Sequence, residues 1–88
     1  MATTLQPGQD VLYQDAAATA ALSNEVHNLV QCLSEKLDAV WRYDKYIQDC
    51  KGDQACSAVF QKMKEDDLRH IQMLRDEIER RCQQGMFR

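Results

Sequence analysis

The apolar residues in the first half of the chain recur at alternating steps of four and three, the spacing of an amphipathic helix that packs along a seam. Asp15 can cap such a helix, and no helix breaker follows before Asp49. We therefore predict a long helix over residues 15–49, preceded by a polar, flexible arm at residues 1–14. The seam comprises Val26, Val30, Leu33, Leu37, Val40 and Ile47, and Asp44 takes one position of the same seam.

A turn at residues 50–53 separates this helix from a second one. Gly52 can adopt the left-handed conformation that ends a helix, and Asp53 can cap the next. The second helix is predicted over residues 54–84, before a short tail at residues 85–88. A turn this short folds the two helices back antiparallel. The apolar stripe of the second helix comprises Phe60, Met63, Ile71, Leu74 and Ile78, and Asp67 and His70 fall on the same stripe.

The size of the chain predicts that the hairpin does not stand alone. With 88 residues it is a single all-α domain, and domains this small bury too little surface for a comfortable core. One proline, three glycines and many straight-chain side chains favour helix over sheet. We therefore expect the antiparallel two-helix hairpin to self-associate into a four-helix bundle.

Charge and hydropathy exclude two classes of partner. The formal net charge is −3, whereas nucleic-acid binders usually present a basic face. No apolar run is long enough to cross a bilayer, and the N-terminus lacks the charged and apolar blocks of a signal peptide. The expectation is a cytoplasmic protein that binds neither nucleic acid nor membrane.

The four cysteines allow three interpretations. Without a signal peptide, the favoured one is that Cys32, Cys50, Cys56 and Cys82 are reduced thiols that are partly buried. Cys50 and Cys56 bracket the turn, so they could instead close a small disulfide staple. They could also form half of a metal site that two subunits share.

An acid and a histidine point inward from the second helix. Asp67 and His70 are three residues apart, so both side chains project to one side of the helix. In the hairpin, residues whose numbers sum to about 105 lie level, which brings Glu35, Lys36 and Asp38 to the height of this pair. One interpretation is that the polar groups simply hydrogen-bond each other or a partner helix. The other is an iron or manganese site completed by a second copy.

Three stretches of the chain carry a family resemblance: EKLDAVWRYD at residues 35–44, EDDLRH at residues 65–70 and EIERR at residues 77–81. Together they resemble the encapsulated-ferritin-like branch of the ferritin-like superfamily. The resemblance covers about half of the chain. It implies two-helix hairpins that pair into four-helix bundles, as a homo-oligomeric dimer or a ring of dimers. It also implies iron as the cofactor at a subunit interface, with oxidation of ferrous iron as the activity.

The resemblance carries over to individual residues. Asp67 and His70 stand where the family has its acid and histidine ligands on the second helix, and Tyr43 matches a tyrosine beside the site. Lys36 stands where the family has a bridging glutamate. The other acids that could complete a metal site are Asp38 and Asp44, and then Glu35, which points away from the seam.

Two hypotheses follow for function. The first is a ferritin-like oligomer that binds iron through Asp67, His70 and an acid of the first helix. The alternative is a metal-free helical scaffold or interaction module, in which Lys36 forms an ion pair with Asp67 and polar contacts specify the pairing. No nucleophile, base and orienting acid can be placed together, so catalysis by a serine or cysteine nucleophile lacks support.

Overall fold

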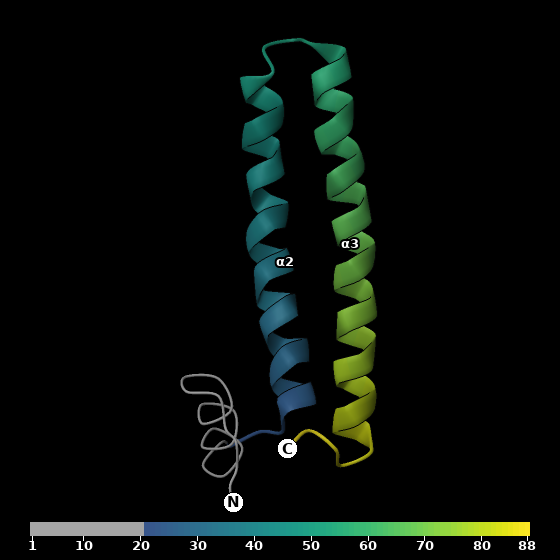
Figure 1. Cartoon of the computed structure of the whole chain (residues 1–88). Helices are drawn as coiled ribbons and strands as arrows, with labels where there is room; N and C mark the ends of the chain where they lie inside the picture. Colours follow the sequence, from purple (N-terminus) through teal and green to yellow (C-terminus); the bar gives the residue numbers. More distant parts are fainter. Residues whose placement is uncertain (1–20) are drawn as a thin grey trace, which may run out of the picture.

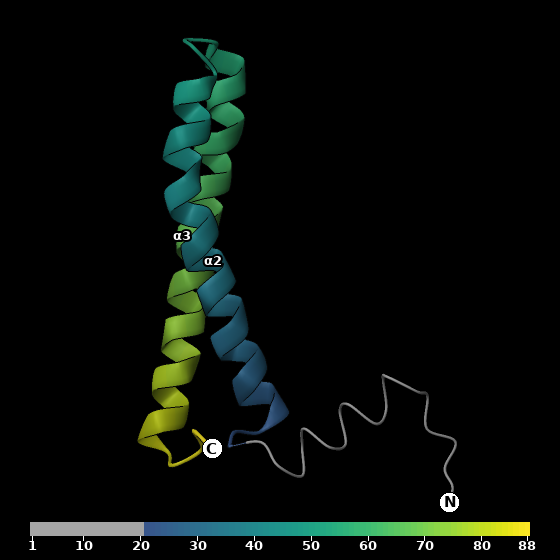
Figure 2. The ribbon, with the colours of Figure 1, turned by 90° about the vertical axis from the view of Figure 1, so that its left-hand side faces the viewer.

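The structure is a computed structural model that describes residues 21–88, and this part of the chain is an antiparallel hairpin of two α-helices. Helix α2 spans Asn24–Asp49 and helix α3 spans Gln54–Gln83. The helices run side by side from the turn, and the C-terminus lies near the start of α2 (Figure 1). In the perpendicular view they cross and diverge away from the turn (Figure 2). The predicted all-α hairpin is confirmed.

Helix α2 begins later than predicted. The predicted start at Asp15, like the predicted arm, lies outside the described residues. The backbone at Ser23 is extended, with φ −65° and ψ 163°, so no helix continues through this residue. The Ser23 hydroxyl accepts a hydrogen bond from the backbone N–H of Val26 at 3.4 Å, and its carbonyl accepts one from His27 at 2.9 Å. Serine favours this capping role over a helix interior, so the prediction of one unbroken helix from Asp15 is wrong.

The turn forms where the sequence predicts it. Lys51 and Gly52 have φ of 54° and 84°, and only glycine adopts this left-handed region at little cost. The Asp53 carboxylate caps α3 by accepting a hydrogen bond from the backbone N–H of Cys56 at 3.1 Å. Gly85, with φ 70°, follows the end of α3 in the same role. Local sequence signals therefore determine both breaks in the chain.

A disulfide joins the two helices at the turn. Cys50 and Cys56 are bonded, with 5.9 Å between their Cα atoms. The favoured prediction of four partly buried, reduced thiols is therefore wrong for this pair, because the turn brings the two residues within bonding distance. Cys32 and Cys82 are free, but both are exposed rather than partly buried. Of the three interpretations, the disulfide staple is the one that the structure contains.

Helix α2 uses only half of its predicted seam to contact α3. Every second predicted position is exposed, and the residue just before it faces α3 instead. The confirmed positions are Val26, Leu33, Val40 and Ile47. The exposed positions are Val30, Leu37 and Asp44, and the residues that take their places are Leu29, Lys36 and Tyr43. Both arrangements have steps of three and four, so apolar spacing alone does not choose between them.

Helix α3 follows its predicted stripe more closely. Asp67 and Ile71 are buried, and Phe60, Leu74 and Ile78 are half-buried. Two predicted members lie at the edge of the stripe instead: Met63 is 44% exposed and His70 is exposed. Neither α2 nor α3 contains a stretch that is apolar enough over a membrane-spanning length to cross a bilayer.

Candidate functional site

A buried carboxylate lies at the centre of the hairpin. Asp67 on α3 is 7% exposed, and both of its oxygens accept hydrogen bonds. Lys36 Nζ donates to Oδ1 at 2.8 Å, and the hydroxyl of Tyr43 donates to Oδ2 at 2.9 Å. Nδ1 of His70 lies 3.2 Å from Oδ1. We call these four residues the polar cluster.

The heptad spacing of α2 places the partners of Asp67. Lys36 and Tyr43 are seven residues apart, so they lie on the same face of α2, two turns from each other. The ring of Tyr43 is held by aromatic neighbours near the turn, with centroid distances of 6.1 Å to Tyr46 and 6.5 Å to Phe60. Because the buried ring is fixed in this way, its hydroxyl reaches Asp67 in one defined position.

The electrostatics of the polar cluster keep Asp67, Lys36 and Tyr43 in their ordinary charge states near neutral pH. The hydrogen bond from Lys36, and then those from Tyr43 and His70, hold the pKa of Asp67 below its ordinary value, although burial acts to raise it. The same hydrogen bond raises the pKa of Lys36. Burial, and then the bond to Asp67, raises the pKa of Tyr43. The cluster therefore contains a carboxylate, an ammonium group and a neutral phenol.

The predicted acids of α2 do not join this cluster. Glu35 accepts a hydrogen bond from Gln31 at 3.1 Å. Asp38 pairs with Arg42 at 2.8 Å on the outside of α2. The remaining acid, Asp44, pairs with Lys64 of α3 at 2.7 Å. The structure thus brings together Asp67, His70, Lys36 and Tyr43, and it leaves Glu35, Asp38 and Asp44 elsewhere.

These residues do not fit an iron ion within one chain. Within residues 21–88, no group of three histidine, cysteine or acidic side chains lies close enough to hold a metal. The ammonium of Lys36 contacts the Asp67 oxygen that a cation would need, and a positive charge at this distance opposes cation binding. The predicted ion pair of Lys36 and Asp67 is confirmed. The predicted iron site shared between two copies stays a prediction.

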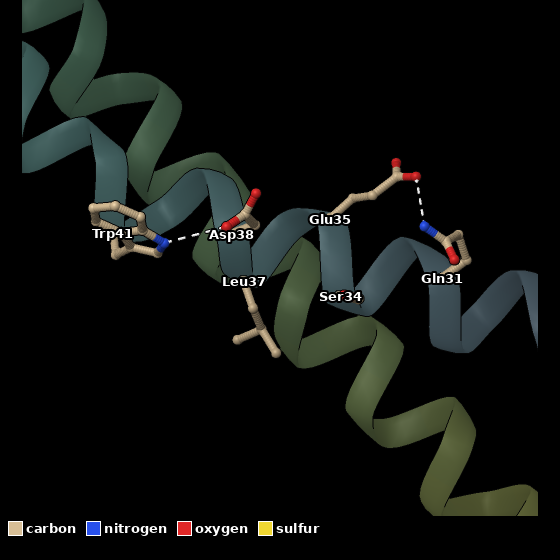
Figure 3. A pocket seen from close by; sticks show the side chains of 6 residues that line it. All are labelled: Gln31, Ser34, Glu35, Leu37, Asp38 and Trp41. Carbon is tan, nitrogen blue, oxygen red and sulfur yellow. Dashed lines mark hydrogen bonds between the residues drawn. The ribbon is translucent and has the colours of Figure 1, made fainter.

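Sequence reasoning missed a second feature on the outside of α2. Val30 and Leu37, which were expected in the seam, are exposed together with Trp41. Beside them lies a shallow hollow of about 500 Å³ whose lining comes from α2 alone (Figure 3). The signal that could have found this surface is the step of four from Leu37 to Trp41, which continues the pattern of apolar residues away from the α3 contact.

Comparison of the chain with protein-family models, with curated proteins and with solved structures gives no match. The resemblance of residues 35–44, 65–70 and 77–81 to the ferritin-like branch therefore stays a prediction. The hairpin architecture does not bear on this resemblance, and Lys36 places a cation beside Asp67. The chemistry of the polar cluster and the apolar surface of α2 are the features from which function can be inferred.

Proposed function

We propose that this hairpin is a metal-independent self-association module, in which two hairpins pair into a four-helix bundle and the bundle acts as a scaffold. The observation that carries the proposal is the poor coverage of its apolar surface. Among residues 21–88, the buried apolar side chains are Val26, Tyr43 and Ile71. Exposed large apolar side chains outnumber them, and they include Val30, Leu37, Trp41 and Leu68. Exposure on this scale is typical of a surface that another protein covers.

The polar cluster has a role in this scaffold. A buried ion pair adds little net stability, but a polar contact inside a helical bundle can specify the register of the helices. Lys36 and Asp67 can form their ion pair only in the observed register of α2 and α3. Sliding α3 by one turn would leave a buried carboxylate without its cation. The cluster therefore disfavours alternative pairings that the apolar residues alone would tolerate.

Sedimentation velocity in the presence of a chelator tests the proposal. The wild type should sediment as a dimer or larger species at micromolar concentration, with or without EDTA. A folded protein that stays monomeric at all accessible concentrations contradicts the proposal. The double variant Lys36→Leu, Asp67→Leu should fold and still associate, but its amide NMR spectrum should show more than one set of signals, because the contact that specifies the register of α2 and α3 is gone. A single set of signals from this variant would contradict the role of the polar cluster.

A second candidate function is the iron site shared between two copies. One observation favours it: His70 lies beside Asp67, and its side chain is 45% exposed, on a surface that a second chain can reach. Metal analysis after anaerobic incubation with ferrous ion tests it, with the double variant Asp67→Ala, His70→Ala as control. About one iron per two chains, lost in the variant, would support this candidate. Equal iron in both proteins would exclude it.

The cellular location is a proposal as well. Disulfides persist mainly in oxidising compartments, whereas cytosolic thiols are usually kept reduced. The Cys50–Cys56 bond therefore favours an oxidising environment over the predicted cytoplasm. Rapid alkylation of cells followed by mass spectrometry tests this point. Alkylation of all four cysteines would support the cytoplasm, and alkylation of Cys32 and Cys82 alone would support an oxidising compartment.

A further inference from the structure

Three of the four large apolar residues that α2 exposes lie along one line, and the fourth, Tyr46, lies off it. Val30, Ser34, Leu37 and Trp41 are spaced by four, three and four residues, so they lie along one side of the helix, and we call them the α2 stripe. Val30 is 38% exposed, Leu37 is 50% exposed and Trp41 is 63% exposed. No member of the stripe carries a charge. It also adjoins the half-buried seam residues Leu33 and Val40.

The α2 stripe contains a large and a small side chain one heptad apart. Trp41 has the largest side chain of the stripe, and Ser34, one heptad before it, has the smallest. Ser34 lies in the hollow of about 500 Å³ that runs along α2 (Figure 3). The indole Nε1 donates a hydrogen bond to Asp38 at 3.3 Å, which orients the ring. The lining residues of the hollow are Gln31, Ser34, Glu35, Leu37, Asp38 and Trp41.

Helix α3 adds an apolar residue on the same side of the hairpin. The ion pair of Asp44 and Lys64 connects the helices on one side. Leu37 lies one heptad before Asp44, and Leu68 lies one turn after Lys64, so both leucines belong to this side. Leu68 is 48% exposed. The apolar surface therefore extends across both helices.

The size of this side matches what a stable dimer needs. Helix α2 has 26 residues, which at about 1.5 Å per residue gives a length of about 39 Å. Two helices, each about 10 Å wide, give this whole side of the hairpin, polar residues included, a projected area of about 800 Å². A standard protein interface buries about this area on each partner.

From these observations we infer that a second copy of this chain docks on the α2 stripe around a two-fold axis near Leu37. The inference rests on the self-association proposed above and specifies its surface. The two copies of α2 run antiparallel and face each other. Ser34 and Trp41 are nearly equidistant from the axis, on either side of it, so the indole of each copy lies over Ser34 of the other. Each α3 packs at the flank, where Leu68 meets the second hairpin. The interface is isologous, and both copies use the same surface.

Trp41 provides a direct readout because it is the chain's single tryptophan. Its indole is exposed in the isolated hairpin and buried in the inferred dimer. Its emission maximum should therefore move to shorter wavelength as the protein concentration rises. The shift should follow the dimer fraction measured by sedimentation. Association without any change in Trp41 emission would overturn the inference and leave the proposed self-association intact.

A pair of matched variants tests the surface itself. Leu37→Glu places a charge in the stripe, and Met63→Glu places one at a position of similar exposure. Met63 lies two heptads before Glu77, which lines a separate hollow with Cys32 on the other side of the hairpin. Circular dichroism establishes that both variants are folded.

The two variants should differ in their dimer dissociation constants. Leu37→Glu should raise the constant by about 100-fold or more, because both copies lose a buried leucine. Met63→Glu should change it by less than about threefold, as expected of a surface substitution outside an interface. The reverse ranking would overturn the inference while preserving self-association. A monomeric wild type would instead refute the proposed function.

Cross-linking tests the two-fold axis. Residues near such an axis lie beside their own copies, so Leu37→Cys should form an interchain disulfide on mild oxidation. The background for this variant is Cys32→Ser with Cys82→Ser, which removes the exposed free thiols. Met63→Cys in the same background should stay uncross-linked. A dimer in which Leu37→Cys does not cross-link faster than Met63→Cys would overturn the inferred axis.

Discussion

The polar cluster and the α2 stripe reverse the usual arrangement of a helical protein. Between the helices, where apolar side chains are expected, α2 and α3 bury a carboxylate and a phenol, and the carboxylate pairs with the half-buried ammonium group of Lys36. On the outside of α2, where polar side chains are expected, Val30, Leu37 and Trp41 are exposed. The difference between these regions indicates a division of roles. The inside specifies how one hairpin folds, and the outside provides the apolar area for joining a second one.

This division has a physical basis in what each kind of contact does well. Hydrogen bonds between charged groups depend strongly on geometry, so they discriminate between registers. Apolar burial is roughly proportional to area and is non-directional, so it supplies affinity without strict geometry. Substitutions in the polar cluster should therefore change the stability and register of the hairpin, whereas substitutions in the α2 stripe should change association.

The largest expected effect is that of Asp67→Ala, which should lower the free energy of unfolding by about 3 kcal/mol, because two hydrogen bonds to a charged group are lost. The substitution leaves Lys36 and Tyr43 without their common acceptor. Urea denaturation followed by circular dichroism measures the loss. Asp66→Ala, at the neighbouring and more exposed position, is the control and should leave the stability unchanged. If Asp67→Ala abolishes dimer formation in a folded protein, the division of roles is wrong.

Reduction of the Cys50–Cys56 disulfide should lower the free energy of unfolding by about 2 kcal/mol. The disulfide closes a loop between residues six apart in the sequence, and the unfolded chain gains conformational entropy when this loop opens. Thermal unfolding with and without a reducing agent measures this effect. The variant Cys32→Ser, Cys82→Ser should respond like the wild type, since its disulfide is intact. An unchanged melting temperature on reduction would show that the helices near the turn are held by Tyr43 and its aromatic neighbours alone.

Tyr43→Phe should lower the free energy of unfolding by about 1 kcal/mol, since it removes one hydrogen bond to Asp67 and keeps the buried ring. Chemical denaturation at several protein concentrations separates this loss from association. Tyr46→Phe is the matched control on the same helix, and it should have little effect. A loss for Tyr43→Phe no larger than that for the control would mean that the Tyr43 hydroxyl contributes little and that its ring packing is the main contribution.

The smallest expected effect is a loss of stability at low pH. The pKa of Asp67 is lower in the folded protein than its ordinary value of 3.8, chiefly because of Lys36. A carboxyl group with a depressed folded pKa stabilises the protein above its unfolded pKa, and this contribution disappears as the pH falls through the folded pKa. The stability difference between the wild type and Asp67→Asn should therefore be constant above about pH 5 and shrink below it.

A second carboxyl group titrates in the same direction and must be separated from Asp67. Hydrogen bonds from Arg80 and Arg81 lower the pKa of Glu77 to about 2. Glu77→Gln should therefore leave the acid-dependent difference between the wild type and Asp67→Asn in place. A difference that stays constant down to pH 3 would mean that the Asp67 carboxylate is not stabilised by its partners.

The sequence by itself determined the two helices, the turn between them and which residues lie level across the hairpin. Helix spacing, Gly52 and Asp53 act within a few residues, so the hairpin and its antiparallel direction could be predicted. The ion pair of Lys36 and Asp67 could be predicted too, because counting residues from the short turn shows which residues of the two helices lie at the same height. The start of α2 could not be predicted, since a serine such as Ser23 can either cap a helix or lie within one.

Only the tertiary structure decided which side of α2 faces α3. The steps of four and three fit two neighbouring faces equally well, one with Val30, Leu37 and Asp44 and one with Leu29, Lys36 and Tyr43. The second face was chosen because a buried Asp67 needs hydrogen-bond donors, and Lys36 and Tyr43 supply them. That choice left the apolar residues of the first face outside. The free surface of this protein is thus a consequence of how its buried charge is satisfied.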